Sequence, residues 1–243
     1  MIHAIVTGHS RGLGAAIADI LLASGVRVLG VARRGNPDLA ARHASSLTQA
    51  QVDLADPAAL VQWLDGGALG AFLEGATRVA LVNNAGTLGP VGPLGTQAPD
   101  EIARAVALNV SAPLILANAL IAATPDAGDR RILHVSSGVA RRPLPGWSVY
   151  CATKAAVDHH ARTVASDALP GVTIASLAPG VIDTDMQAQI RASDVGNFPM
   201  LAHFQALKRE GQLSSPQDCA GRLVDYLLSE RFRNGDITDL RDL

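Results

Sequence analysis

The sequence has few aromatic side chains and almost no cysteine. Aromatic residues make up 3% of the 243 residues, so a buried core must be built mainly from aliphatic side chains. The two cysteines, Cys151 and Cys219, are far apart and follow no disulfide or zinc-binding pattern. We therefore expect no metal site and a reducing, cytoplasmic location.

The sequence also lacks a strong charge of one sign and a long hydrophobic run. The net charge is -2, and no basic stripe with interleaved aromatic residues suggests nucleic-acid binding. The longest apolar run, Ala112–Ala123, is interrupted by Asn118 and is too short to cross a bilayer. The first residues do not follow the pattern of a signal peptide. We expect neither a nucleic-acid partner nor a membrane segment.

What the sequence does contain is a regular alternation of short aliphatic runs and longer amphipathic stretches. The runs predict strands at Ile2–Thr7, Arg27–Ala32, Ala50–Asp53, Arg78–Val82, Arg131–Ser136 and Val172–Ala178. The amphipathic stretches predict helices near Leu13–Ser24, Pro57–Leu64, Pro99–Thr124 and Val149–Leu169. Alternating strands and helices indicate a parallel sheet covered on both faces. Because no linker or repeat divides the chain, we expect one doubly wound α/β domain over residues 1–243.

Residues 183–215 differ from the rest, with mixed polarity and no clear strand. Ligands of open α/β sheets bind at the carboxyl ends of the strands, and this segment follows a late strand. We predict that it forms a mobile lid over a substrate, although an ordinary pair of surface helices would fit the same pattern.

A glycine-rich turn follows the first predicted strand. Its glycines allow a tight turn and a close approach of backbone N–H groups to a pyrophosphate, which the positive end of the next helix would attract. The spacing differs from G-x-G-x-x-G, so a purely geometric need for glycine stays open. The residues expected to bind the anion are Gly8, Ser10, Arg11, Gly12, Leu13 and Gly14.

The end of the second predicted strand indicates which dinucleotide binds. An acidic residue there usually binds the free ribose 2′-hydroxyl, but here Ala32 is followed by Arg33 and Arg34. Arg33 can bind a 2′-phosphate through paired hydrogen bonds, and Arg11 is expected on the same side. The pattern favours NADP(H), with solvated surface arginines as the alternative.

Tyr150 and Lys154 stand four residues apart on a predicted helix, so they share one face, with Cβ atoms roughly 5–6 Å apart. An ammonium about 5 Å from a phenol favours the phenolate by roughly 3 kcal/mol at an effective dielectric of ~20. We therefore expect a pKa of Tyr150 lowered by about two units, suited to protonating a carbonyl oxygen. Ser136 and Ser137 could hold that oxygen, and Asn109 could order a water, although both positions also suit capping or backbone bonding.

In combination, the motifs resemble the short-chain dehydrogenase/reductases over nearly the whole chain. The matching residues, in order, are Thr7-Gly8-x-x-x-Gly12-x-Gly14, Asp53-Leu54, Asn83-Asn84-Ala85-Gly86, Asn109, Ser137, Tyr150-x-x-x-Lys154 and Pro179-Gly180 with Thr184. The resemblance implies a Rossmann fold in which Ser137 polarises a carbonyl and Tyr150 donates the proton. It also implies that Lys154 lowers the tyrosine pKa and binds the nicotinamide ribose, while Asn109 holds a proton-relay water.

The same resemblance implies the remaining cofactor contacts and an assembly. Asp53 and Leu54 would lie beside the adenine, and Asn84, Ala85 and Gly86 beside its ribose. The nicotinamide end would be contacted by Pro179, Gly180, Val181 and Thr184. The helices that carry Asn109 and Tyr150 would join subunits into a homodimer or homotetramer.

The C-terminal half is also similar to sepiapterin reductases. The segments that carry this likeness are Gly146–Ala156, Ala178–Gln187 and Gly235–Asp239. In that group an aspartate near the C-terminus anchors the pterin, and Asp239 stands at the matching place, where a turn or dimer contact is equally compatible. Benzil reductases, which act on aryl diketones, share the same motifs, so the likeness does not choose the substrate.

We expect NADPH-dependent reduction of a ketone or diketone to an alcohol. A sepiapterin reductase is the alternative within enzymes, and an NADP-sensing protein without catalysis is the alternative outside them. The four catalytic residues together argue against the sensor. Trp147 and Met186 are candidate substrate contacts, with simple packing as the other interpretation of each.

Overall fold

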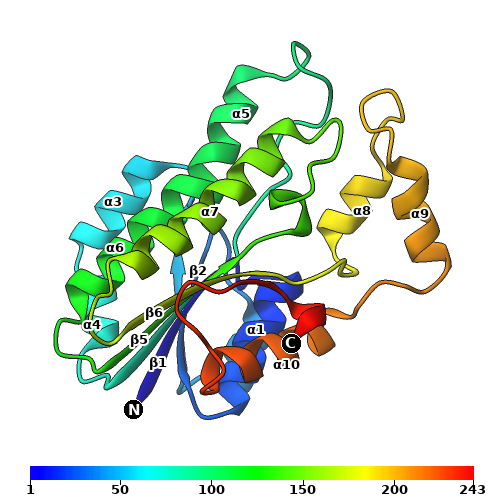
Figure 1. The fold of residues 1–243 in the computed structure, drawn as a ribbon. Helices are drawn as coiled ribbons and strands as arrows, with labels where there is room; N and C mark the ends of the chain where they lie inside the picture. Colours follow the sequence, from blue (N-terminus) through cyan, green and yellow to red (C-terminus); the bar gives the residue numbers. More distant parts are fainter.

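Seven parallel strands form the centre of the computed structural model, which describes residues 1–243 (Figure 1). Their order in the sheet is β3-β2-β1-β4-β5-β6-β7, and every neighbouring pair is parallel. The strands are β1 (Ile2–Thr7), β2 (Arg27–Ala32), β3 (Leu47–Gln51), β4 (Arg78–Asn83), β5 (Asp129–Val135), β6 (Val172–Ala178) and β7 (Ile237–Asp239). The predicted doubly wound fold is confirmed, and the reversal of strand order between β1 and β4 opens a crevice at the carboxyl ends.

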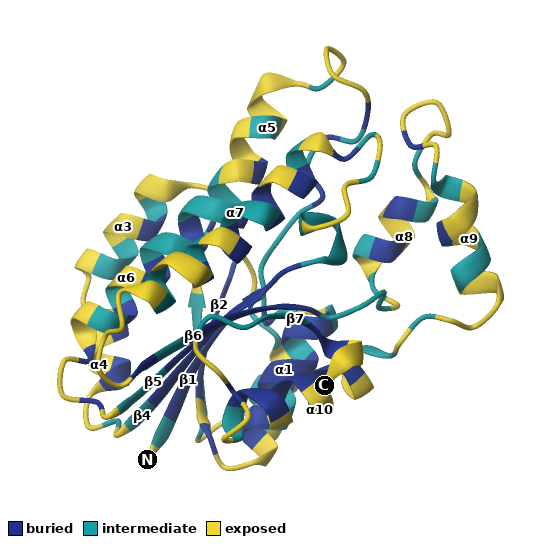
Figure 2. Cartoon of the chain, in the orientation of Figure 1, coloured by how far each residue is buried: buried dark blue, intermediate teal, exposed yellow.

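Helices cover both faces of the sheet, and two separate aliphatic cores lie beneath them. One face carries α1 (Gly12–Ala23), α2 (Pro37–Arg42) and α10 (Pro216–Leu228). The other carries α3 (Pro57–Asp65), α4 (Ala68–Leu73), α5 (Pro99–Val106), α6 (Ala112–Ala123) and α7 (Ser148–Ser166). The central strands are buried along their length (Figure 2), which explains their nearly continuous apolar runs.

The sequence pattern missed the short elements β7, α2 and α4 and also the 13-residue helix α10, and it placed β3 too late. β3 begins at Leu47, three residues before the expected position, because Thr48, Gln49 and Gln51 give this partly exposed edge strand a polar sequence. β7 has three residues and extends the sheet beside β6, too short for a periodic signal. The short helices α2 and α4 escaped prediction for the same reason.

Residues 99–123 form one continuous helical stretch, in which the π-helical segment η1 (Ala107–Ser111) joins α5 to α6. This 25-residue helix is long and apolar enough, by length and composition, to cross a membrane. Its bounds agree with the helix predicted at Pro99–Thr124, and it exceeds the apolar run Ala112–Ala123 because it also includes the more polar residues 99–111. In this structure the helix packs on the sheet and on α7.

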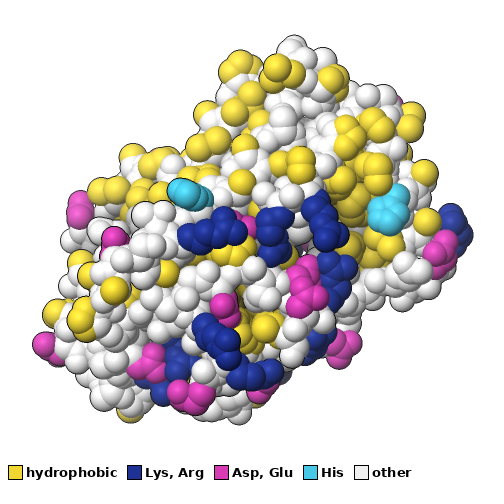
Figure 3. Space-filling model, in the orientation of Figure 1, with side chains coloured by type: hydrophobic (Ala, Val, Ile, Leu, Met, Phe, Trp, Pro, Cys, Tyr) yellow, Lys and Arg dark blue, Asp and Glu magenta, His cyan; other side chains and the backbone are white.

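The segment 183–215 forms two helices beyond the carboxyl ends of the strands (Figure 1). These helices, α8 (Asp185–Arg191) and α9 (Leu201–Arg209), pack against each other. A one-turn helix η2 (Gly138–Ala140) follows β5, and a second, η3 (Leu240–Asp242), ends the chain. Basic and acidic side chains gather together across the middle of the face below α8 (Figure 3).

Candidate active site

A cleft of about 1410 Å³ runs along the carboxyl edge of the sheet. It is lined at one end by the glycine-rich turn and at the other by Ser137, Tyr150 and Lys154, with α8 beside them. Every cofactor and substrate residue expected from the sequence borders this cleft, and of the catalytic set only Asn109 lies behind it. No group of three or more His, Cys, Asp or Glu side chains is placed to hold a metal ion.

The glycine-rich turn is closely packed against the segment after β4. A Cβ atom on Gly14 would lie 2.2 Å from the Gly8 carbonyl oxygen and 2.4 Å from Asn84 Nδ2. The Asn84 amide donates to the Thr7 carbonyl at 2.9 Å, and the Thr7 hydroxyl accepts from the N–H groups of Asn84 and Ala85. Gly8 and Gly12 adopt positive φ angles of 72° and 57°, which only glycine enters without strain.

The start of α1 is free to bind an anion. Its N-cap, Arg11, makes no side-chain capping hydrogen bond, and its first turn contains no acidic residue. The unpaired N–H groups and the positive end of the helix dipole therefore face the cleft without a competing carboxylate in that turn. A phosphate group fits this end of the cleft.

His9, within the turn, is fully buried behind the cleft rather than bordering it. Its Nε2 lies 2.8 Å from Gln49 Oε1, which also accepts the Asn36 N–H at 2.6 Å. The ring packs on Gly30, where a Cβ atom would lie 2.4 Å from it. Burial lowers the pKa of His9. The neutral ring of His9 therefore packs the turn against β2 and β3.

Three arginines, Arg11, Arg33 and Arg34, border the cleft beside the glycine-rich turn and the end of β2. Arg33 and Arg34 are exposed and border it, as expected for residues that meet a 2′-phosphate. Arg11 instead forms an ion pair with Asp185 of α8 at 2.7 Å, with both side chains about two-thirds exposed. Asp53, the expected adenine contact, pairs with Arg104 at 3.1 Å.

Tyr150 and Lys154 lie one turn apart on α7, and both are buried. The Lys154 ammonium donates to the Val135 carbonyl at the end of β5, at 2.8 Å, and lies 5.7 Å from the centre of the Tyr150 ring. Ser137 comes two residues after β5, and its hydroxyl accepts the Val139 N–H at 3.4 Å. The end of β5 thus brings the predicted serine, tyrosine and lysine to one place.

Burial controls the protonation of this pair. It raises the pKa of Tyr150 to about 12, with the Ser137 hydroxyl opposing, and lowers the pKa of Lys154 to about 8, with Asp158 opposing. The expected lowering of the tyrosine pKa is therefore wrong for the chain alone, because removing the phenolate from water outweighs the attraction of the lysine. At neutral pH the tyrosine is protonated and the lysine is charged, which is the state that proton donation requires.

Asn109 lies in η1 with its side chain 1% exposed. Its Oδ1 accepts the Thr87 N–H at 2.9 Å, while its Nδ2 donates to the Thr87 carbonyl and to Thr153 Oγ1, at 2.7 and 3.1 Å. The side chain therefore fastens the segment after β4 to α7, directly behind Lys154. Its predicted role in holding a relay water stays a prediction. Thr87 was not expected from the sequence, and nothing in its local pattern identifies it.

An aromatic cluster lines the cleft beside Tyr150. Trp147 is 3% exposed, stacks on Phe198 with ring centres 4.6 Å apart, and meets the Tyr150 ring edge-on at 5.6 Å. Trp147 borders the cleft as well, so the same ring both packs in the cluster and forms part of the cleft wall. Met186 borders the cleft and packs against the same cluster. The scarcity of aromatics could have pointed to Phe198 and Phe204 as partners of Trp147.

Asp239 borders the cleft, but both of its oxygens are bound within the chain. Its Oδ1 accepts from the Arg241 backbone and Nε, at 3.0 and 2.8 Å, and its Oδ2 accepts from the same guanidinium at 2.7 Å. Of the two roles considered, the structure shows the turn contact, since Asp239 caps η3. Sequence reasoning missed Arg241, although its place two residues after an aspartate allows this pairing.

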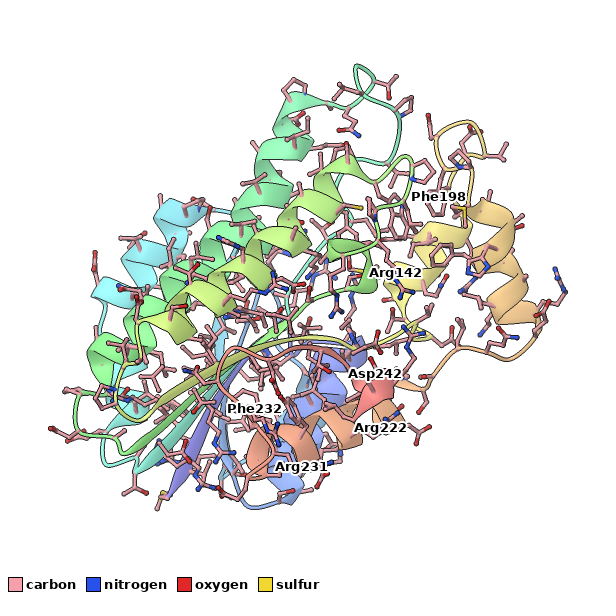
Figure 4. The ribbon with its side chains drawn as sticks, viewed as in Figure 1. Arg142, Phe198, Arg222, Arg231, Phe232 and Asp242 are labelled. Atoms are coloured by element: carbon pink, nitrogen blue, oxygen red, sulfur yellow. The ribbon has the colours of Figure 1, made fainter.

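Two further arginines directly follow η2 and border the cleft. Arg141 donates to the carbonyls of Ile237 and Thr238, joining η2 to β7. Arg142 borders the cleft on the side of α8, opposite the end of the chain at Asp242 (Figure 4). Both follow Ser137 closely in sequence, and neither was expected at the site.

The chain matches known proteins along most of its length. The family model described as short chain dehydrogenase matches residues 2–195. A benzil reductase ((S)-benzoin forming) of Bacillus cereus is 35% identical, covering 98% of both chains. A sepiapterin reductase of Meriones unguiculatus is 35% identical, covering 98% of this chain and 95% of the relative.

Solved structures show the same fold. A short-chain dehydrogenase/reductase of Burkholderia vietnamiensis is 52% identical with a TM-score of 0.73, covering 80% of this chain and 93% of the other. A short chain dehydrogenase of Burkholderia cenocepacia in complex with NADP is 32% identical with a TM-score of 0.78, covering 97% and 94%. The chain therefore belongs to the short-chain dehydrogenase/reductase family, whose members are oxidoreductases that bind a nicotinamide cofactor.

Proposed function

We propose that this protein uses NADPH to reduce a ketone or diketone to an alcohol. The observation that carries the proposal is one cleft with an anion-binding turn at one end and a buried tyrosine–lysine pair beside a serine hydroxyl at the other. A dinucleotide whose pyrophosphate binds at the turn would place its nicotinamide in the same cleft as this pair, so cofactor binding and proton transfer would occur at one site.

The residues of this chain fit NADP(H) better than NAD(H). The N–H groups at the start of α1 would hold the pyrophosphate, and the exposed Arg33 would bind the 2′-phosphate, helped by Arg34. No acidic residue stands at the end of β2 to bind a free 2′-hydroxyl. The structure of the Burkholderia cenocepacia relative contains NADP, which supports the same choice.

Proton transfer falls to three side chains. When bound, the reduced nicotinamide supplies the hydride. Ser137 donates a hydrogen bond to the substrate carbonyl oxygen, and Tyr150 gives that oxygen its proton. The Lys154 ammonium stabilises the phenolate that remains and would hold the nicotinamide ribose. Because Tyr150 is buried and protonated at neutral pH, it suits the reductive direction.

The walls of the cleft favour an aryl ketone or aryl diketone. Trp147 and Phe204 border the cleft beside Tyr150 and offer flat apolar surfaces. The similarity to benzil reductases supports this substrate class. A pterin side-chain carbonyl is the second candidate, supported by the sepiapterin reductases and by Asp239 at the cleft. We place it second because Arg241 already occupies both oxygens of that carboxylate.

Three further features belong to the proposal. The helices α5–α6 and α7 would join subunits in a homodimer or homotetramer, and the protein would act in the cytoplasm. Residues 183–215 would close over the substrate as a lid, since α8 borders the cleft. A non-catalytic NADP sensor is disfavoured, because such a protein has no need of Asn109, Ser137, Tyr150 and Lys154 together.

A substrate panel tests the proposal. NADPH oxidation is measured with benzil, sepiapterin and simple aliphatic ketones, and the products are identified. We expect the highest kcat/KM with the aryl diketone and an alcohol as product. A protein that binds NADPH but turns over no carbonyl compound would be a sensor, and preference for sepiapterin would move the pterin to first place.

A further inference from the structure

The proposed mechanism needs a positively charged Lys154, but the side chain is buried, and burial disfavours charge. It is 6% exposed, and burial lowers the pKa of its ammonium. Its side chain donates one hydrogen bond, to the neutral Val135 carbonyl, so no carboxylate touches it directly. A buried ammonium without a counter-ion tends to lose its proton.

Asp158 is placed to supply that counter-ion. It follows Lys154 by one turn of α7, so the two side chains share a face with Cβ atoms roughly 5–6 Å apart. The carboxylate is 4% exposed, accepts a hydrogen bond from Ser176 Oγ at 2.7 Å, and has no protein partner for Oδ2. A buried acid held in this way costs stability unless a nearby positive charge compensates it.

The other groups packed around Lys154 do not offer a second negative charge. On the same helix, Tyr150 is protonated at neutral pH, and from β5 His134 faces the lysine as a neutral ring, because burial lowers its pKa to about 3. Asn109 from η1 and Ser176 from β6 are neutral side chains. Asp158 is thus the one acid whose charge opposes the effect of burial on Lys154.

We propose that Asp158 is a positioning residue, whose buried carboxylate, held by Ser176, keeps the Lys154 ammonium charged beneath Tyr150. It touches neither substrate nor cofactor. It acts through the lysine, which lies on the same buried face of α7. This inference deepens the proposed function, and it rests on that function only where activity is measured.

The charge on Lys154 can be observed without any reaction. The chain contains two lysines, Lys154 and Lys208, so protein labelled with ¹³C at lysine Cε gives two signals, and Lys208→Arg assigns them. In the cofactor-free wild type we expect Lys154 to titrate near a pKa of about 8. Asp158→Asn keeps the shape and the bond to Ser176, and we expect it to lower that midpoint by roughly one pH unit or more.

Ser176→Ala is the matched control, because it removes the hydrogen bond and keeps the carboxylate. If Asp158 only ties α7 to β6, Ser176→Ala lowers the melting temperature, Asp158→Asn keeps the bond and lowers it less, and neither variant moves the lysine midpoint. If its charge matters, only Asp158→Asn moves the midpoint, and the alkaline loss of kcat/KM for reduction moves to lower pH with it.

An unchanged Lys154 midpoint in folded Asp158→Asn would overturn the proposal. If Asp158→Asn does not fold, the Lys154 midpoint of the wild type is the test. A midpoint below pH 7 would mean that Asp158 does not keep the ammonium charged, and it would contradict the proposal. Absence of any reductase activity, with the lysine midpoint shifted as expected, would refute the proposed function and leave the Asp158–Lys154 coupling standing.

Discussion

The guanidinium of Arg241 holds both carboxylate oxygens of Asp239, at 2.8 and 2.7 Å, at the edge of the cleft. The Arg241 side chain lies against Gly180, where a Cβ atom would be 3.9 Å from its Cδ. An amino-heterocycle that needs this carboxylate must therefore displace an arginine that lies against Gly180.

Replacing Arg241 should widen the substrate range. In Arg241→Ala, Asp239 is free to accept hydrogen bonds from an amino-pyrimidine, and a charge-assisted bond contributes about 1.5–3 kcal/mol. We expect kcat/KM for sepiapterin to rise roughly tenfold or more, with little change for benzil. Asp239→Ala should give no such gain. Equal effects of Arg241→Ala on both substrates would show that the arginine acts on something other than Asp239.

Arg33 should determine the choice between the two dinucleotides. Arg33→Ala removes a guanidinium that would bind the 2′-phosphate, and loss of about 2 kcal/mol corresponds to roughly thirty-fold weaker NADPH binding. The affinity for NADH should stay nearly constant. Equilibrium binding of both cofactors measures the ratio, with Asp185→Asn as a companion variant that frees Arg11 from its ion pair. A parallel loss of both affinities would assign Arg33 to general electrostatic attraction.

Gly30 should tolerate no side chain. A Cβ atom there would lie 2.4 Å from the buried ring of His9, which Gln49 holds in place. We expect Gly30→Ala to lower the free energy of unfolding by about 1–3 kcal/mol through overpacking. Gly70→Ala is the control, because nothing lies within 4 Å of its Cβ position in α4. Chemical denaturation compares the two, and equal stabilities would mean that His9 can move aside.

The rate of reduction should fall as the pH rises through about 8, because that is where Lys154 loses its proton. The sign follows from the mechanism: the ammonium stabilises the phenolate that Tyr150 leaves, so the protonated lysine is the active form. Tyr150, whose pKa is raised to about 12, stays protonated over this range. A profile of kcat/KM against pH measures the effect, and a rate that increased above that pH would assign the limiting ionisation to another group.

The sequence was sufficient for the parts of the molecule that local pattern controls. The central strands follow from hydrophobic periodicity, and the tight turn follows from the glycines that allow positive φ angles. The shared face of Tyr150 and Lys154 follows from the helical repeat. The edge strand β3 was predicted three residues too late because its exposed and half-buried positions include polar side chains. Residues 37–42 and 237–239 are too short to show a period.

The chemistry of the site depended instead on burial and on distant partners, which a sequence does not display. The pKa of Tyr150 moved opposite to expectation because the phenol is buried. Asn109 is bound by Thr87 and Thr153, and His9 by Gln49, across separations of at least 22 residues. The partner of Asp239 is nearer, since Arg241 is two residues away, but the pairing of its side chain with both carboxylate oxygens is seen only in the structure.

The central claim is that Tyr150 donates the proton. The chain has two tyrosines, which gives a matched pair of variants. Tyr226 is buried in the opposite core with its hydroxyl bonded to Asp236 at 2.9 Å, so Tyr226→Phe removes one hydroxyl away from the cleft. NADPH oxidation with benzil should fall by roughly a hundredfold or more in Tyr150→Phe and persist in Tyr226→Phe, with NADPH binding retained in both. Unchanged turnover in Tyr150→Phe would contradict the mechanism.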